Sequence, residues 1–299
     1  MKKKILINIE LTSRCFANCA MCPRQEVTDF GSISEETMET VLSQIDPEFV
    51  WEVNFSGRGE PTLHQNLPAV LSKLQRTSVK SALVTTGVCV TPAIAEALDS
   101  NVDKIRLSVS SFDSESFSRV HTGLNYKTVW ENIAFMAKRF PQKIVCHLVG
   151  GPPIYDSLPE TVAHLRSLGL SELYLFPLWN RAGSQETKQI RAKRLALLEE
   201  LQIPPSEQEY ANGDDEAFKA DNVKYCEVNK NYCPVGDSSM AIGYNGDIVG
   251  CFQDFGHKTV LGNIHRDNLK EVYERRKMLL GNMAICNGCN TKKEALVCS

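Results

Sequence analysis

Three cysteines, Cys15, Cys19 and Cys22, lie close together directly after an apolar run at residues 5–10. The run predicts a first β-strand, and parallel α/β folds place functional side chains in the loops that follow their strands. Thiolates suit iron–sulfur clusters, and three of them can each bind one iron of a cubane and leave the fourth iron open. A zinc knuckle is the alternative, but zinc sites usually add a second close pair, and none lies nearby.

Eleven cysteines are many for a chain of 299 residues if it is cytoplasmic, where disulfides are rare, so most of them are expected to bind metal. We interpret Cys89 and Cys146, which stand alone near apolar stretches, as buried small hydrophobic residues. The net charge of −3 and the scattered basic residues argue against nucleic-acid or membrane partners. No cleavage-like pattern follows the first residues and no run is long enough to span a membrane, so we expect a cytoplasmic protein.

Short β-branched runs alternate with helical patterns up to about residue 180, which is typical of a parallel α/β fold. Six βα units fit this span, too few for a closed TIM barrel, so we expect an open, partial (βα)6 barrel. Ser32, three residues before Glu35, suggests a capping box. The predicted strands are residues 5–10, 51–55, 80–85, 104–109, 143–149 and 172–176, and the predicted helices are residues 35–45, 67–74, 92–98, 128–140 and 159–168.

The predicted organisation is a barrel at residues 1–183, a connector at 184–224 and a small cysteine-rich β-hairpin and helix module at 225–299. The connector combines a basic, helix-like piece at 188–201 with an acidic, polar run. In the module, Asn245-Gly246 lies between two apolar segments and predicts a two-residue type I′ hairpin turn. A helix at residues 268–280 is expected to follow the hairpin.

The C-x3-C-x2-C spacing of Cys15, Cys19 and Cys22 resembles the hallmark of the radical S-adenosylmethionine (radical SAM) superfamily. The resemblance implies a partial (βα)6 barrel and a [4Fe–4S] cluster that these three cysteines hold. S-adenosylmethionine would bind the open iron, beside Met21, and on reduction would yield a 5′-deoxyadenosyl radical. The protein would bind and orient that cofactor and exclude water.

Three later segments resemble cofactor-binding positions of the same superfamily. Ser56-Gly-Arg-Gly59-Glu60-Pro61 is similar to its Gly-Gly-Glu motif, in which Gly59 and Glu60 match best. Thr85-Thr86-Gly87 resembles its Thr-Asn-Gly turn. Ser108 and Ser110 end the fourth strand, where a hydroxyl meets the cofactor. Each segment alone is also ordinary strand-end turn chemistry.

The last quarter of the chain resembles the SPASM/Twitch modules of radical SAM enzymes. The resemblance assigns Cys233, Cys251, Cys286 and Cys289 to a second, fully ligated [4Fe–4S] cluster that transfers electrons. Ala295 replaces the next cysteine of the full SPASM pattern, which favours one auxiliary cluster. A zinc ribbon is the alternative use of the same four residues.

A more specific resemblance is to the 2-deoxy-scyllo-inosamine dehydrogenase of butirosin biosynthesis, through residues 251–255, 258, 262–264 and 180–183. It implies oxidation of a secondary-alcohol carbon of a sugar, aminocyclitol or similar polar small molecule, with one substrate electron passing to the auxiliary cluster. Arg181 is the candidate for orienting the substrate hydroxyl, and Phe252 and Gln253 are candidate substrate contacts. A flavodoxin- or ferredoxin-type protein is the expected electron donor.

Three other functions remain open on the sequence. In an epimerase, a spare thiol, Cys226 or Cys298, would return a hydrogen atom to the substrate, although either thiol could instead bind the auxiliary cluster. A peptide maturase is less favoured, because the first strand begins near residue 1 and leaves no room for a leader-binding domain. A non-catalytic iron–sulfur or zinc-binding protein is the last alternative.

Overall fold

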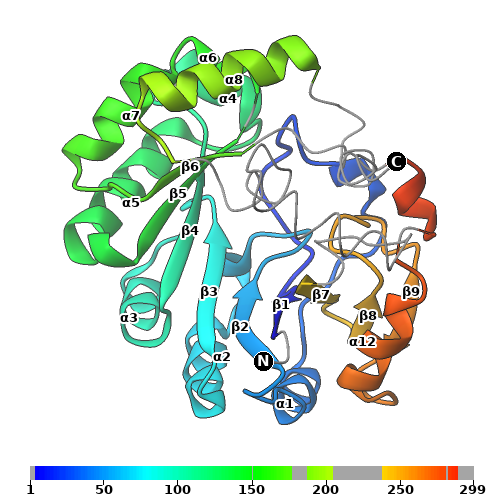
Figure 1. The fold of residues 1–299 in the computed structure, drawn as a ribbon. Coiled ribbons are helices and arrows are strands. Elements are labelled where there is room, and N and C mark those ends of the chain that lie inside the picture. Colours follow the sequence, from blue (N-terminus) through cyan, green and yellow to red (C-terminus); the bar gives the residue numbers. More distant parts are fainter. Residues whose placement is uncertain (1–3, 150, 177–186, 205–237, 281, 289–299) are drawn as a thin grey trace.

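The computed structural model describes residues 4–149, 151–176, 187–204, 238–280 and 282–288. Its centre is a nine-stranded sheet in the order β6-β5-β4-β3-β2-β1-β7-β8-β9 (Figure 1). The first six strands pair in parallel with their neighbours, which confirms the predicted open, partial barrel. Their bounds are β1 (Ile5–Ile9), β2 (Val50–Phe55), β3 (Lys80–Thr85), β4 (Lys104–Val109), β5 (Ile144–Leu148) and β6 (Leu173–Leu175).

The helices between these strands cover the outer face of the sheet (Figure 1). The five predicted helices are present as α1 (Glu35–Ser43), α2 (Leu67–Leu74), α3 (Pro92–Asn101), α5 (Tyr126–Arg139) and α7 (Leu158–Ser167). The sequence prediction lacked two short helices, α4 (Ser114–Val120) and α6 (Pro152–Tyr155).

The predicted cap of α1 is wrong by two residues. Ser34, which directly precedes the helix, accepts a hydrogen bond from the backbone N–H of Thr37 at 3.0 Å. Ser32 instead donates to the Thr12 hydroxyl at 3.0 Å. Only the residue next to the first turn can reach the free amide groups of that turn, and here this residue is Ser34.

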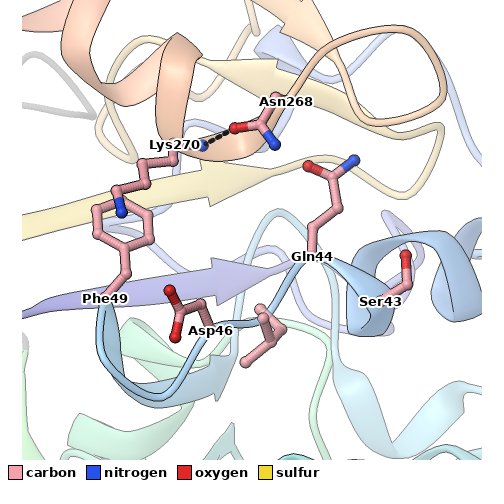
Figure 2. Close-up of a pocket in the computed structure, with 7 residues that line it drawn as sticks. Ser43, Gln44, Asp46, Phe49, Asn268 and Lys270 are labelled. Atoms are coloured by element: carbon pink, nitrogen blue, oxygen red, sulfur yellow. Dashed lines mark hydrogen bonds between the residues drawn. The ribbon is translucent and has the colours of Figure 1, made fainter.

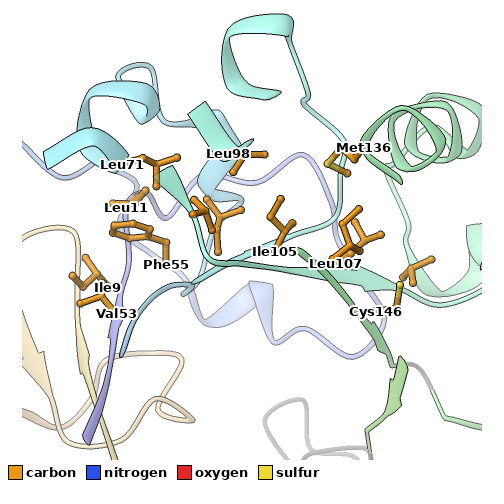
Figure 3. Packing of buried hydrophobic residues seen from close by; sticks show 14 of the residues in the cluster. Ile9, Leu11, Val53, Phe55, Leu71, Leu98, Ile105, Leu107, Met136 and Cys146 are labelled. Carbon is orange, nitrogen blue, oxygen red and sulfur yellow. The ribbon is translucent and has the colours of Figure 1, made fainter. Parts of the chain in front are cut away.

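The main hydrophobic core lies between the strands and the helices (Figure 3). Ile9, Phe55 and Leu107 point from the strands toward helix residues such as Leu71 and Met136, and all five side chains are fully buried. The same core confirms the interpretation of Cys146, which is fully buried in it, and this burial raises the pKa of its thiol to about 12. Cys89 is half-buried against this core.

The C-terminal strands continue the barrel sheet. The strand β7 (Ser239–Ile242) pairs in parallel with β1, while β8 (Asp247–Val249) and β9 (Val260–Asn263) add in antiparallel fashion. The helix α12 (Leu269–Lys277) follows, with the Asn268 side chain capping its first turn. The predicted hairpin and helix are therefore present, together with a third strand, β9, that the sequence did not predict.

The hairpin turn differs from the predicted type I′ turn. Gly246 has a φ of +85°, but Asn245 does not have the positive φ that a type I′ turn also requires. The Gly246 N–H donates to the Gly243 carbonyl at 2.9 Å, so the connection spans residues 243–246 and Gly246 closes it. The Asn245 side chain accepts from the Asp247 N–H at 3.2 Å, an Asx turn that competes with the two-residue geometry.

The helix α8 (Lys188–Glu200) lies within the segment that we predict as a connector. Its Leu197 and Leu198 are buried in the main core, and Lys193 forms an ion pair with Asp156 at 2.8 Å. This part of the segment thus packs on the barrel. None of the helices in the described ranges is long and apolar enough to cross a membrane.

A pocket lies between the α1–β2 connection and the start of α12 (Figure 2). Gln44 spans it by accepting from the Leu269 N–H at 2.7 Å and donating to the Ile264 carbonyl at 3.0 Å. The α1–β2 connection enters the amino end of β2, whereas the cysteine loop leaves the carboxyl end of β1. The pocket is therefore at the amino ends of the strands, whereas the cysteines are at their carboxyl ends.

Candidate active site

The cysteine loop begins at the carboxyl end of β1 and returns on itself. The Ser13 N–H donates to the Gly31 carbonyl at 3.0 Å, and the Ile33 N–H donates to the Leu11 carbonyl at 2.8 Å. The Thr12 hydroxyl also donates to the Gly31 carbonyl, at 2.8 Å. These bonds hold the two ends of the loop together, so the cysteines lie in a closed loop at the carboxyl end of β1.

Cys15, Cys19 and Cys22 lie together in this loop. Burial, followed by the neighbouring Cys22 and Cys15, raises the pKa of Cys19 to about 12, and burial also raises the pKa of Cys15. Three half-buried thiols, of which Cys19 is held protonated by burial and by the other two, fit a metal cluster, because coordination to iron offsets the cost of buried thiolates. No three His, Cys, Asp or Glu side chains in the described ranges converge on one metal ion, and a cubane does not require this, since each thiolate binds a different iron.

The second-strand loop packs directly on the start of the cysteine loop. A Cβ at Gly59 would lie 2.2 Å from the Thr12 carbonyl oxygen and 2.5 Å from that of Arg14. The Glu60 N–H donates to the Arg14 carbonyl at 2.9 Å. Glycine is therefore required at position 59 because two backbones meet there.

Glu60 and Thr85, two of the predicted cofactor residues, bind each other in this structure. The Thr85 hydroxyl donates to one Glu60 carboxylate oxygen at 2.6 Å, and the Thr86 hydroxyl donates to the other at 2.8 Å. Thr62 contributes a further hydroxyl bond at 2.8 Å. The buried Glu60 thus joins the ends of β2 and β3, and its contact with the cofactor stays a prediction.

The two predicted serines have different surroundings. Ser108 is half-buried on the face of β4 that also carries Arg106. Ser110 is fully buried, and its hydroxyl lies 2.8 Å from Nε2 of His121 and bonds the Val149 carbonyl. Their cofactor contacts, and that of Met21, which packs partly against the main core, also stay predictions.

His121 is a site residue that the sequence analysis missed. Its Nδ1 lies 3.3 Å from Sγ of Cys19, and burial lowers its pKa to about 4. The segment that carries it lies between β4 and α5 and has no cysteine or recognisable motif. Only the fold brings it to a cysteine more than a hundred positions earlier in the chain.

Arg58 is a second missed residue, in the loop that carries Gly59 and Glu60. This residue is 4% exposed and donates two guanidinium N–H groups to the Glu10 carboxylate, each at 2.8 Å. It also binds Asp29 at 2.7 Å, and Asp29 accepts the Tyr244 hydroxyl at 3.1 Å. Burial opposes the charge, but Glu10 and Asp29 outweigh it and raise the pKa of Arg58. A single guanidinium thus connects the residue after β1 with the cysteine loop and, through Asp29, with the C-terminal hairpin.

The barrel interior is lined by polar side chains. Arg106 donates to both carboxylate oxygens of Glu52, at 2.7 and 3.0 Å, and to the Asn54 side chain at 2.9 Å. Asn54 continues the network to Asn8 at 2.8 Å. His147 is the neighbour of Ser108 in the sheet, and burial and then Arg106 lower its pKa to about 3, so it is neutral at ordinary pH.

The predicted auxiliary ligands are only partly within the described residues. Cys251 and Cys286 share a small hydrophobic cluster with Leu280 and Met283. Gln253, whose N–H points to Sγ of Cys251 at 3.5 Å, is 2% exposed, and its side-chain oxygen has no hydrogen-bond partner among the described residues. Phe252 is half-buried beside it. The remaining predicted residues, Arg181, Cys226, Cys233, Cys289 and Cys298, lie outside the described ranges.

Comparison with known proteins gives the family. Residues 9–165, more than half of the chain, match the radical SAM superfamily. The chain belongs to this superfamily. Residues 233–290 match SPASM, an iron–sulfur cluster-binding domain. The protein is thus a radical SAM enzyme with a SPASM domain, and S-adenosylmethionine and iron–sulfur clusters are its cofactors.

Two curated relatives each match less than half of the chain. A probable GTP 3′,8-cyclase of Sulfolobus acidocaldarius is 32% identical over 121 residues, 40% of this chain and 38% of that protein. A PqqA peptide cyclase of Gluconobacter oxydans is 32% identical over 114 residues, 37% of this chain and 32% of that protein. The matched region thus spans about a third of the length of these relatives, so their activities do not transfer to this radical SAM enzyme.

Solved structures share the fold at low identity. Streptococcus suis SuiB bound to its precursor peptide SuiA covers 98% of this chain and 71% of SuiB, with a TM-score of 0.71 and 14% identity. BtrN in complex with AdoMet and 2-DOIA covers 97% of this chain and 94% of BtrN, with a TM-score of 0.58 and 18% identity. Both confirm the radical SAM fold across nearly the whole chain.

Proposed function

We propose that this radical SAM enzyme is an oxidoreductase that oxidises a secondary-alcohol carbon of a sugar, an aminocyclitol or a similar polar small molecule. The observation that supports it is the polar interior of the barrel, where Asn8, Asn54, Arg106 and His147 present donors and acceptors. The first three of these side chains already bond one another, and the remaining donors and acceptors suit a small molecule with several hydroxyl or amino groups better than an apolar substrate. The fold likeness to BtrN, solved with AdoMet and 2-DOIA, is consistent with this proposal.

In this proposal Cys15, Cys19 and Cys22 hold the cluster that binds S-adenosylmethionine. When bound, these cofactors would supply the radical chemistry that removes a hydrogen atom from the substrate. Gly59 lets two loops approach closely, and Glu60 and Thr85 hold the ends of β2 and β3 together. Ser108 and His147 face the barrel interior, and Arg181 is proposed to orient the substrate hydroxyl.

The proposed auxiliary ligands are Cys233, Cys251, Cys286 and Cys289. Conversion of an alcohol to a ketone removes two hydrogens: one leaves as a hydrogen atom to the 5′-deoxyadenosyl radical, and the other as a proton to solvent or a protein base together with one electron. An auxiliary cluster is the proposed acceptor of that electron, and a flavodoxin- or ferredoxin-type protein the proposed donor for the first cluster.

The test uses anaerobically reconstituted, reduced enzyme with a panel of polyols and aminocyclitols, some deuterated at the carbinol carbon. We expect 5′-deoxyadenosine to gain the deuterium from one class of substrate, and the product to be a ketone that is two mass units lighter than the unlabelled substrate. Turnover is expected to survive Cys226→Ser and Cys298→Ser. The same assay is repeated with unlabelled substrate in D2O. An epimerase would instead give a product that gains one deuterium from the solvent. If Cys226→Ser or Cys298→Ser then abolishes this product while 5′-deoxyadenosine still forms, that cysteine is the hydrogen donor.

Peptide modification is the second candidate, favoured by the higher TM-score of the likeness to SuiB bound to SuiA. The discriminating measurement adds unstructured peptides to the same assay. Formation of 5′-deoxyadenosine that rises only with a peptide, which then changes mass, would replace the small-molecule proposal. Formation of 5′-deoxyadenosine that rises only with polyols or aminocyclitols would support the small-molecule proposal.

A further inference from the structure

The last residue of α4 and the backbone that follows it lie along the cysteine loop. Residues 120–123, which we call the α4 strap, accept hydrogen bonds on both sides of Cys19. The Asn18 N–H donates to the Thr122 carbonyl at 2.7 Å, and the Ala20 N–H donates to the Val120 carbonyl at 2.8 Å. The strap therefore holds His121 opposite Cys19 through the backbone.

His121 is enclosed between two partners. It is 1% exposed, and its Nδ1 lies 3.3 Å from Sγ of Cys19 while its Nε2 lies 2.8 Å from Oγ of Ser110. The Ser110 hydroxyl also reaches the Val149 carbonyl. A neutral imidazole has one N–H group, and a hydroxyl has one hydrogen, so these contacts cannot be filled independently.

Counting hydrogens gives two arrangements. While Cys19 is a thiol, its S–H can donate to Nδ1, the Nε2–H can donate to Ser110, and Ser110 can donate to Val149. An iron-bound thiolate has no hydrogen to donate, so this arrangement would direct a lone pair of Nδ1 at a negatively charged sulfur. In the other arrangement Nδ1–H donates to sulfur and Ser110 donates to Nε2.

We propose that His121 donates a hydrogen bond from Nδ1 to Sγ of Cys19 when this thiolate binds iron, that the Ser110 hydroxyl then donates to Nε2 instead of to the Val149 carbonyl, and that the bond to sulfur raises the reduction potential of the cluster. The inference rests on the proposed ligand role of Cys19. A donor at a thiolate ligand stabilises the reduced cluster more than the oxidised one, because the reduced cluster carries more negative charge. His121 is thus a positioning residue that eases the one-electron reduction on which cofactor cleavage depends.

Two variants separate the donor at Nδ1 from the presence of the side chain. His121→Asn can place its amide N–H near the position of Nδ1, whereas His121→Gln places its amide near Nε2 and keeps only the contact with Ser110. The measurement is a redox titration of the reconstituted holoenzyme followed by EPR. The cluster of interest is the one whose reduced signal changes when S-adenosylmethionine is added.

In His121→Gln we expect the equilibrium constant for one-electron reduction to fall about tenfold, which is about 59 mV toward more negative potential. His121→Asn is expected to stay near wild type, and Ser110→Ala to shift in the same direction as His121→Gln but by less. Equal potentials in wild type and His121→Gln, with full iron content in both, would overturn the inference. Wild-type protein without any cluster that responds to S-adenosylmethionine would instead contradict the proposed function.

Discussion

Arg58 shows at the residue scale how one buried charge organises the site. Its guanidinium donates to Glu10, directly after β1, and to Asp29 in the cysteine loop, and the ring of Tyr244 lies 5.8 Å away. Hydrogen bonding and charge from Arg58 outweigh burial and lower the pKa of Asp29. A buried pair of this kind contributes little net stability, but loss of one partner leaves the other charge uncompensated.

We therefore predict that Arg58→Gln lowers the free energy of unfolding of the apoprotein by about 3–5 kcal/mol, measured by chemical denaturation. Tyr244→Phe removes one hydrogen bond at the edge of the same network and serves as the control, with an expected loss of about 1 kcal/mol. Addition of Glu10→Gln to Arg58→Gln should cost less than the two single changes together. A loss for Arg58→Gln no larger than that of the control would refute this account.

The α4 strap, at the scale of an element, also supports the cysteine loop. It ends at Gly123, which has a φ of +89° and whose Cβ would lie 2.8 Å from the Phe16 carbonyl oxygen. Both the conformation and the close approach to the cysteine loop require glycine at this position. Gly169, after α7, has a similar φ of +81° but nothing within 4 Å of its Cβ position.

This contrast provides a matched pair of substitutions. Gly123→Ala and Gly169→Ala should each lose about 1–2 kcal/mol from the left-handed backbone conformation alone. Only Gly123→Ala is expected to displace the cysteine loop, and so to lose iron from the cluster that responds to S-adenosylmethionine during anaerobic gel filtration. Equal iron retention in the two variants would show that the strap does not support that cluster.

At the scale of the whole molecule, the barrel and the C-terminal strands form one sheet with one main core. The pairing of β1 with β7 continues the sheet, and Met240, Ile248 and Val272 belong to the same hydrophobic cluster as Ile7 and Val53. The two regions that the superfamily and SPASM matches define are therefore packed together. Loss of one proposed cluster need not unfold the region that holds the other.

We predict that the reconstituted protein holds about eight irons, four in each of two cubanes. The triple substitution Cys15→Ala, Cys19→Ala and Cys22→Ala should leave about four, with the auxiliary cluster intact. Cys146→Ala, at a buried cysteine outside both proposed ligand sets, is the control and should leave iron content unchanged. Zinc in place of iron in the wild type, or loss of all iron in the triple variant, would contradict two independent clusters.

Local pattern was sufficient for most of the barrel elements. The strands β3 and β4 and the helix α2 occupy the predicted residues, because their apolar runs and bounding turn residues act within a few positions. The prediction of a type I′ turn at Asn245-Gly246 was wrong. The Asx turn of Asn245 favours a longer connection, and so does the close packing of Gly246 on Ile264, whose Cγ2 would lie 2.9 Å from a Cβ at Gly246.

The sequence alone determined the superfamily, since the spacing of Cys15, Cys19 and Cys22 after a strand reflects what a cubane requires of a short loop. It could not give His121 or Arg58 a role, because His121 belongs to no motif and Arg58 lies in the Gly-Gly-Glu-like segment at a position that the motif does not specify. Both act through partners distant in sequence: Cys19 for His121, and Glu10, Asp29 and Tyr244 for Arg58. Burial decides the weight of those contacts, since charges and hydrogen bonds count most where water is excluded, and only the tertiary structure sets which groups are buried together.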